Sequence, residues 1–123
     1  MRAFDSLRGR REFTLVIRRG TPVVRGALTV YGFAPRAATR LKLGVVIPKT
    51  VGKAVRRNLL RRRCKAIFEN ARWRPPHRWY VVACRQGAAG LTFAELESHL
   101  TSAVAEAGAA KRQIPARRAR GRS

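Results

Sequence analysis

The distribution of charge constrains this chain more than any other feature of its sequence. Lys and Arg together number 28 against six Asp and Glu, which gives a formal net charge of +22 in 123 residues. No acidic residue lies between Glu12 and Glu69, and fourteen Lys or Arg residues fall in that interval. Folding brings these like charges together, which destabilises the compact state unless a polyanion binds it. The pattern indicates a nucleic acid or an anionic membrane surface as the partner, and it favours nucleic acid.

The length and the apolar content predict one compact domain with a basic tail. Apolar residues make up 46% of the chain, which is enough for a modest core. We expect this domain to span residues 1–108. The remaining residues, 109–123, include six basic residues and no acid. Such a segment buries too little apolar area to offset the entropy lost on ordering, so we expect it to be disordered.

Two further features indicate the compartment. The charged N-terminal segment is not followed by the apolar stretch of a signal peptide, and no apolar run approaches the ~20 residues that span a bilayer. Cys64 and Cys84 lie far apart and outside any C-x-x-C spacing, which favours two small buried hydrophobes in a reducing compartment over a zinc site. We therefore expect a cytoplasmic protein with no membrane partner.

Hydrophobic periodicity predicts an α+β domain in the order helix, strand, strand, helix, strand, helix. The helices are expected over 10–19, from Gly52 or Lys53 to about Ala71, and over 92–108; the strands are expected over 23–33, 41–47 and 79–84, with room for a short extra strand between Pro35 and Arg40. Thr92 and Glu95 form a capping box at the start of the last helix. The apolar face of that helix is predicted to consist of Phe93, Leu96, Leu100, Ala103, Val104 and Ala107.

The second helix carries the clearest functional pattern. On a helical wheel, one side is apolar and is predicted to face the core; it consists of Leu60, Cys64, Ile67 and Phe68. The opposite side consists of Ala54, Asn58, Arg61, Arg62 and Lys65, with Arg57 beside it. Arg56 and Arg63 flank the apolar side, where either an RNA contact or a structural role fits them.

These residue types suit a phosphodiester backbone. Arg presents a planar fork that binds phosphate oxygens bidentately. Asn58 both donates and accepts, which suits a 2′-hydroxyl, a base edge, or a hydrogen bond that fixes the preceding loop. Lys49 and Lys53 precede the helix on either side of a turn at Gly52, where the first amides of the helix favour an anion. The competing interpretation is an exposed basic helix that only keeps the protein soluble.

The segment from Val46 to Lys65 closely resembles the signature of the bacterial ribonuclease P protein family. The direct matches are Lys49, Val51, Gly52, Ala54, Val55, Arg57, Asn58 and Arg62, and the basic character is kept at Arg61 and Lys65. Weaker similarities are the Phe13–Gly20 helix end, the strand at 80–83 with Arg85, and Leu91–Thr92. The departures are Leu59, which replaces an Arg, Pro48, which replaces a Ser, and Ile17, where an aromatic is common.

The resemblance implies a fold and a function. The fold is a two-layer α/β sandwich with a mixed central sheet and a left-handed β-α-β crossover through the basic helix, similar to the second domain of a small-subunit ribosomal protein. The function is that of the protein subunit of ribonuclease P, which binds the catalytic RNA and the 5′ leader of precursor tRNA to promote 5′ maturation. It also implies that no further protein partner is required.

The resemblance implies two binding surfaces and no catalytic side chain in this chain. The surface for the catalytic RNA consists of Lys49, Lys53, Arg56, Arg57, Asn58, Arg61, Arg62 and Lys65. The leader groove consists of Phe13, Ile17, Tyr31, Arg25 and Arg85, where stacking suits single-stranded RNA without a fixed sequence. Hydrolysis would use Mg²⁺ held by the RNA partner, and no metal ligand is expected here.

Three alternatives belong to other classes of protein. A ribosomal protein would share the size, the charge and the tail, but is not expected to carry the K-x-V-G-x-A-V-x-R-N spacing. A DNA-bending architectural protein would need wedge residues or a dimer interface, which the sequence does not indicate. A protein-only nuclease is the least favoured, because Asp5, Glu12 and Glu69 are too scattered to form a metal site.

Overall fold

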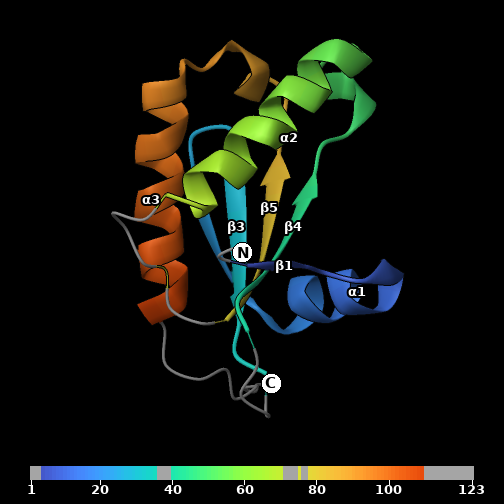
Figure 1. Cartoon of the computed structure of the whole chain (residues 1–123), viewed down its shortest axis with the longest axis vertical. Helices are drawn as coiled ribbons and strands as arrows, with labels where there is room; N and C mark the ends of the chain where they lie inside the picture. The colour runs from blue at the N-terminus through green and yellow to red at the C-terminus, as the bar shows by residue number, and fades with distance from the viewer. Residues whose placement is uncertain (1–3, 36–39, 71–74, 76–77, 110–123) are drawn as a thin grey trace.

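In this computed structural model, the structure describes residues 4–35, 40–70, 75 and 78–109 (Figure 1). The elements are β1 (Asp5–Ser6), α1 (Gly9–Arg19), β2 (Thr21–Arg25), β3 (Leu28–Phe33), β4 (Lys42–Val46), the 3-10 turn η1 (Lys49–Val51), α2 (Ala54–Phe68), β5 (Trp79–Cys84), the 3-10 turn η2 (Ala88–Gly90) and α3 (Phe93–Ala109). The predicted α+β class is confirmed. The predicted tail over 109–123 lies almost wholly outside the described residues, and so does most of the possible strand after Pro35.

The five strands form one mixed sheet in the order β1-β4-β5-β3-β2. Strand β3 runs antiparallel to β2 and β5, whereas β4 runs parallel to β5 and β1. Helix α2 connects the parallel neighbours β4 and β5. Figure 1 shows α2 in front of the sheet with β4 to the right of β5 and both strands pointing upward, so the crossover is left-handed. This hand is rare for such connections, and it agrees with the fold that the family resemblance implies.

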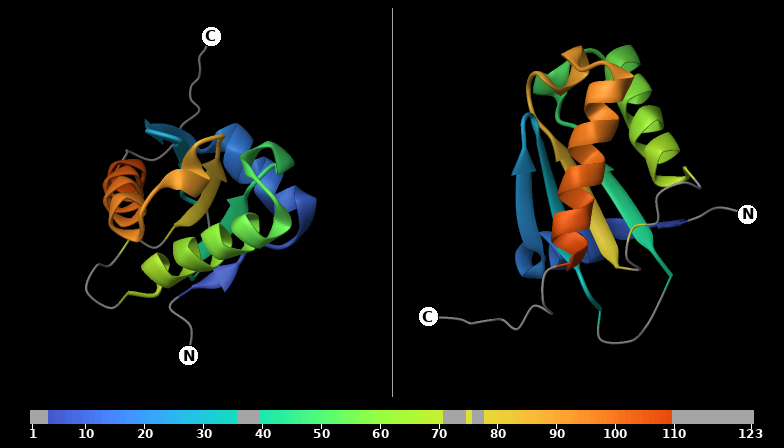
Figure 2. Two further views of the ribbon diagram at one scale, coloured as in Figure 1. Left: turned by 90° about the horizontal axis from the view of Figure 1, so that it is seen from above. Right: turned by 90° about the vertical axis from the view of Figure 1, so that its left-hand side faces the viewer.

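Two helices cover one face of the sheet and the third lies on the other (Figure 2). Helices α2 and α3 pack on the first face over the main core, which includes Leu60, Cys64, Ile67 and Phe68 as predicted, together with Leu96, Leu100, Val104, Tyr80 and Val82. These layers form the predicted two-layer sandwich. Helix α1 covers part of the second face through a smaller cluster formed by Leu7, Val16 and Val81.

The predicted strand over 23–33 is wrong, because this segment forms a β-hairpin. Strands β2 and β3 pair from Thr21 with Gly32 to Arg25 with Leu28, which leaves Gly26 and Ala27 as a two-residue turn. Gly26 has a φ of 57°, a left-handed conformation that favours glycine at this turn position. Its lack of a side chain also leaves room for the ring of His99, which a Cβ would approach to 3.0 Å.

Other boundaries differ from the sequence-based expectation by a few residues. Helix α2 ends at Phe68 rather than near Ala71, and α3 continues to Ala109. The capping box of α3 is confirmed, since the Glu95 backbone N–H donates to Thr92 Oγ1 at 3.1 Å and the Thr92 N–H donates to Glu95 Oε1 at 2.9 Å. The prediction that Phe93 belongs to the buried apolar face of this helix is wrong. This residue shares the apolar side of the wheel but lies in the first turn, outside the core cluster, and is 41% exposed.

Candidate nucleic-acid interface

The core residues of α2 fix which side of this helix faces solvent. Leu60, Cys64 and Ile67 are at most 4% exposed, so the opposite side must point outward. All eight predicted RNA-contacting residues lie on α2 or in the loop immediately before it. The exposed ones are Lys49, Lys53, Arg56, Asn58 and Arg62, and the half-buried ones are Arg57, Arg61 and Lys65.

A side chain of α2 holds the loop that precedes the helix. The Nε of Arg57 donates a hydrogen bond to the carbonyl oxygen of Gly52 at 3.0 Å. Within the loop, the Gly52 N–H donates to the Lys49 carbonyl at 3.2 Å, and the Val51 N–H donates to the Pro48 carbonyl at 3.0 Å. Arg57 therefore fixes the position of Lys49 and Lys53 relative to α2, while the terminal nitrogens of its guanidinium are separate donors suited to phosphate.

Two other side chains of α2 have defined contacts. Asn58 Oδ1 accepts a hydrogen bond from Arg61 Nη1 at 3.3 Å, so Asn58 orients an arginine, and the loop contact considered for it is made by Arg57 instead. Arg63 Nη1 donates to the Leu91 carbonyl at 3.4 Å, next to η2. This contact supports the structural interpretation of Arg63, which the sequence left open.

Among the described residues, the cations of this surface form no ion pair with an acidic side chain. The ion pairs there join Arg25 with Glu106, Arg40 with Asp5, and Lys42 with Glu12, and none involves η1 or α2. The charge of α2 therefore stays available for an external anion.

The opposite face of the sheet carries a second candidate surface. The strand register places a row of small and β-branched side chains beyond the part that α1 covers; this open row consists of Val46, Ala83, Thr29 and Val24. Val24 is 54% exposed and Val46 is 37% exposed. Tyr31 lies in the adjacent row beside Val81 and is half-buried. Sequence reasoning missed Val24 and Val46, because strand pairing is needed to bring them together.

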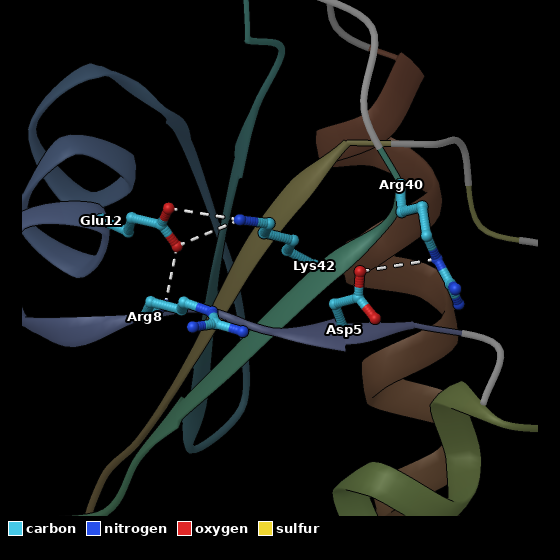
Figure 3. A network of polar contacts seen from close by, with 5 residues as sticks. All are labelled: Asp5, Arg8, Glu12, Arg40 and Lys42. Atoms are coloured by element: carbon cyan, nitrogen blue, oxygen red, sulfur yellow. Dashed lines mark hydrogen bonds and ion pairs between the residues drawn. The ribbon is translucent and has the colours of Figure 1, made fainter.

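Polar contacts fix how α1 crosses this face (Figure 3). Glu12 accepts hydrogen bonds from the Arg8 backbone N–H at 2.7 Å and from Lys42 Nζ at 3.2 and 3.4 Å. Burial alone would raise the pKa of Glu12, but the Arg8 N–H and the Lys42 ammonium outweigh it and lower this pKa. Lys42 Nζ lies 4.6 Å from the ring centroid of Trp79. These two residues pair at the start of β4 and β5, whereas the open row crosses the other end of the same strands. Glu12 therefore marks the flank of α1 that faces away from the open row.

The other flank of α1 faces the open row. Ile17 lies about 140° from Glu12 on the helical wheel and is 40% exposed. Arg10, two turns before Ile17, shares its side and is exposed, which adds a basic residue that the sequence reasoning missed. Phe13 packs closely on Gly44, where a Cβ would come within 2.5 Å of its ring. Phe13 is thus half-buried and has a packing role in this face.

The two predicted groove arginines have different positions. Arg85 follows β5 on the side of the open row, and its Nη2 donates to the Gly26 carbonyl at 2.9 Å. The prediction that Arg25 lies in the leader groove is not supported by its position. Arg25 shares the face of Val23 in β2 and contacts α3, with its Nε donating to Ser102 Oγ at 3.1 Å and its guanidinium paired with Glu106. A strand exposes alternate residues on opposite faces, so Arg25 lies on the far side of the sheet from Phe13 and Tyr31.

The left-handed crossover through an unpaired basic helix defines the class of this protein: a small nucleic-acid-binding α+β protein. Known proteins identify the family within this class. The sequence profile of the Ribonuclease P family matches residues 1–108, and the chain belongs to this family. The ribonuclease P protein component of Shouchella clausii is 32% identical over 101 residues, covering 81% of this chain and 83% of the relative. That of Beutenbergia cavernae is 31% identical, covering 94% and 98%.

Solved structures show the same fold. The ribonuclease P protein of Thermotoga maritima superposes with a TM-score of 0.72 at 26% identity, covering 83% of this chain and 96% of that one. The Staphylococcus aureus protein gives a TM-score of 0.75 at 21% identity, covering 84% and 96%. Membership of the family makes this chain an RNA-binding protein component of a ribonucleoprotein in tRNA processing. In the described residues, no helix combines the length and apolarity that crossing a membrane requires.

Proposed function

We propose that this chain binds the catalytic RNA of ribonuclease P through α2 and its preceding loop, and the single-stranded 5′ leader of precursor tRNA along the open row. The first assignment depends mainly on one observation: the cations of α2 and η1 have no ion-pair partner among the described residues. The loop is held against the helix by Arg57, so the backbone positions that carry these cations are fixed relative to one another. A fixed backbone reduces the entropy that is lost when such a surface binds phosphates.

The open row supports the second assignment. Val24, Val46 and Ile17 offer exposed apolar surface, on which unstacked bases can pack without sequence readout. Arg10 and Arg85 lie on this side of the sheet and can bind the leader phosphates. The two surfaces are on opposite faces of one sheet, so the protein is able to hold both RNAs at once.

Magnesium chemistry is assigned to the RNA partner. Residues 49–65 contain no Asp or Glu, and Mg²⁺ prefers carboxylate and other oxygen ligands, so the donors of the α2 surface do not fit this ion. The protein's own contribution is to bind, orient and reduce phosphate repulsion. It would act in the cytoplasm as a subunit of an endoribonuclease, without catalytic side chains.

The test is cleavage of a 5′-extended precursor tRNA at low Mg²⁺ by the cognate ribonuclease P RNA, with and without the protein. We expect the protein to restore cleavage at the mature 5′ end and to be inactive alone. If the protein leaves cleavage by its cognate RNA unchanged, this result contradicts the proposal and favours the alternative that the chain is a ribosomal protein. Cleavage by the protein alone would contradict the assignment of catalysis to the RNA.

A further inference from the structure

The strip of α2 that lies farthest from the sheet is apolar. Val55 is 79% exposed, Leu59 is 38% exposed, and Ala66 on the same side of the helix is exposed as well. On the helical wheel these three residues lie within about 40° of one another. Cys64, which is fully buried in the core, lies about 180° from Val55. Val55, Leu59 and Ala66 therefore form an outer ridge of α2.

Cations lie on both sides of this outer ridge. Arg61 and Lys65 lie about 120° and 80° from Val55 on one side, and Arg56 lies about 100° from it on the other. Arg61 and Lys65 are half-buried, as expected for stems that pack along the helix with their charged ends at its rim. None of the three cations forms an ion pair within the part of the chain that the structure describes. A polyanion with two backbones can therefore bind on both sides of the ridge.

We propose that α2 binds a double-helical segment of the catalytic RNA from its minor groove, with the outer ridge against the riboses and the flanking cations on the phosphates of the two strands. This binding mode rests on the proposed function, in which α2 is the surface for that RNA, and it specifies the RNA structure that α2 fits. The minor groove of an A-form helix is wide and shallow and displays the 2′-hydroxyls. The short side chains of Val55, Leu59 and Ala66 can reach a shallow surface but not the floor of a deep groove.

Asn58 suits the 2′-hydroxyls of such a groove. It is exposed between the outer ridge and Arg61, and its Oδ1 accepts a hydrogen bond from Arg61 Nη1 at 3.3 Å. This bond fixes the side-chain amide and leaves its nitrogen to donate to a ligand, for which a 2′-hydroxyl oxygen is an acceptor. The 2′-hydroxyl distinguishes RNA from DNA, so this contact predicts a preference for an RNA duplex.

Other occupants of the ridge fit these residues less well. Single-stranded RNA is bound largely by stacking on aromatic side chains, and residues 49–66 contain none. A second copy of the chain related by a twofold axis would set the same cationic surface against itself, and residues 49–65 contain no acid to offset the repulsion. The minor groove of duplex DNA, about 6 Å wide, is narrower than a helix with its side chains, about 10 Å across.

The experiment measures binding of the full-length chain to three probes that carry equal numbers of phosphates: an RNA duplex, a DNA duplex of the same sequence, and a single-stranded RNA. Both duplexes are longer than α2, whose 15 residues span about 22 Å. We expect the RNA duplex to bind most tightly across a salt series and to compete with the catalytic RNA for the protein. Equal phosphate numbers keep the non-specific attraction to the chain's positive charge similar for all three probes.

Val55→Ser and Leu59→Ser test the outer ridge itself. Each should weaken binding of the RNA duplex about fivefold, as the loss of one or two buried methyl groups predicts. The salt dependence of binding should stay unchanged, because no cation is removed. Both side chains are exposed, so both variants should keep the melting temperature of the wild-type chain.

The matched control is Phe93→Ser in α3. Phe93 is 41% exposed, close to the 38% of Leu59, and belongs to neither candidate RNA surface. This variant should bind every probe with wild-type affinity.

Three results would each overturn the proposal: equal affinity for the RNA and DNA duplexes, tighter binding of the single strand, or wild-type duplex affinity in both ridge variants. Self-association of the chain that Val55→Ser abolishes would assign the ridge to a second copy and overturn it as well. Cleavage of precursor tRNA at low Mg²⁺ tests the proposed function separately. If the wild-type chain restores cleavage but gives one of these results, only the groove-binding mode is lost and the assignment of α2 to the catalytic RNA stands.

Discussion

Arg57 Nε lies 3.0 Å from the Gly52 carbonyl oxygen, a contact between α2 and the end of its own preceding loop. Arg57, which we propose as an RNA contact, therefore also holds the loop that carries Lys49 and Lys53. Charge and geometry can be separated at this position, because lysine keeps the charge but lacks an Nε–H at the corresponding point of its side chain.

Arg57→Lys should weaken binding of ribonuclease P RNA about tenfold, which corresponds to about 1.4 kcal/mol and to the lower range for a hydrogen bond from a charged group. The slope of the logarithm of the RNA-binding constant against the logarithm of the salt concentration should stay unchanged, because the variant carries the same number of cations. Arg57→Ala should lower both the affinity and the slope. Filter binding across a salt series measures both quantities, and an Arg57→Lys protein with wild-type affinity would contradict the positioning role.

Arg62 and Arg63 are neighbours with opposite roles. Arg62 is exposed on α2, whereas Arg63 donates to the Leu91 carbonyl at 3.4 Å. Arg62→Ala should reduce the salt slope by about 1 and leave the melting temperature nearly unchanged. Arg63→Ala, the matched control, should lower the melting temperature and retain the slope. The same slope loss in both variants would mean that they share one role.

The lowered pKa of Glu12 predicts how the free energy of unfolding depends on pH. Burial raises the folded pKa of Glu12, but the Arg8 N–H and Lys42 outweigh this effect, so the folded pKa lies below the ordinary value of a glutamate in the unfolded chain. The carboxylate therefore stabilises the fold above that value, and this contribution disappears as the pH falls through the folded pKa. Glu12→Gln should cost about 1 kcal/mol at pH 7. Chemical unfolding from pH 7 to 3 should show this difference shrinking, and a constant difference would contradict it.

The sequence predicted α2 well because a helix surface depends on local spacing alone. Leu60 and Cys64 repeat at the helical period, and the outward arginines follow from the same wheel. Strand β1 was missed because its two residues, Asp5 and Ser6, form a strand only by pairing with β4 far along the chain. The hand of the crossover came from the family resemblance, since no local pattern encodes it.

The groove was harder to predict than the helix, because cross-strand rows depend on register. The predicted continuous strand over 23–33 omitted the turn at Gly26. Without this turn, the pairing of β2 with β3, and so the face of the sheet on which each β2 residue lies, could not be predicted. This is why Arg25 was assigned to the groove although it pairs with Glu106 of α3. Its neighbour Val24 belongs to the open row, and the exposure of a valine cannot be recognised in a sequence until its strand partners are known.

Ile17 offers a gain-of-function test of the leader groove. It is 40% exposed on the flank of α1 that faces the open row. Ile17→Phe adds a ring on which a leader base can stack, worth about 1 kcal/mol or more, so affinity for a precursor with a long leader should rise about fivefold or more. Affinity for mature tRNA, which has no leader, should not change.

The matched control is Phe13→Ala on the same helix. Phe13 packs on Gly44 in the smaller core cluster, so its removal should lower the melting temperature by several degrees. Any loss of leader binding in that variant would then follow from a disturbed α1 rather than from a lost stacking partner. Equilibrium binding of precursors with leaders of increasing length separates the two effects. An Ile17→Phe protein that binds long-leader precursor and mature tRNA with equally raised affinity would place the leader away from this flank of α1.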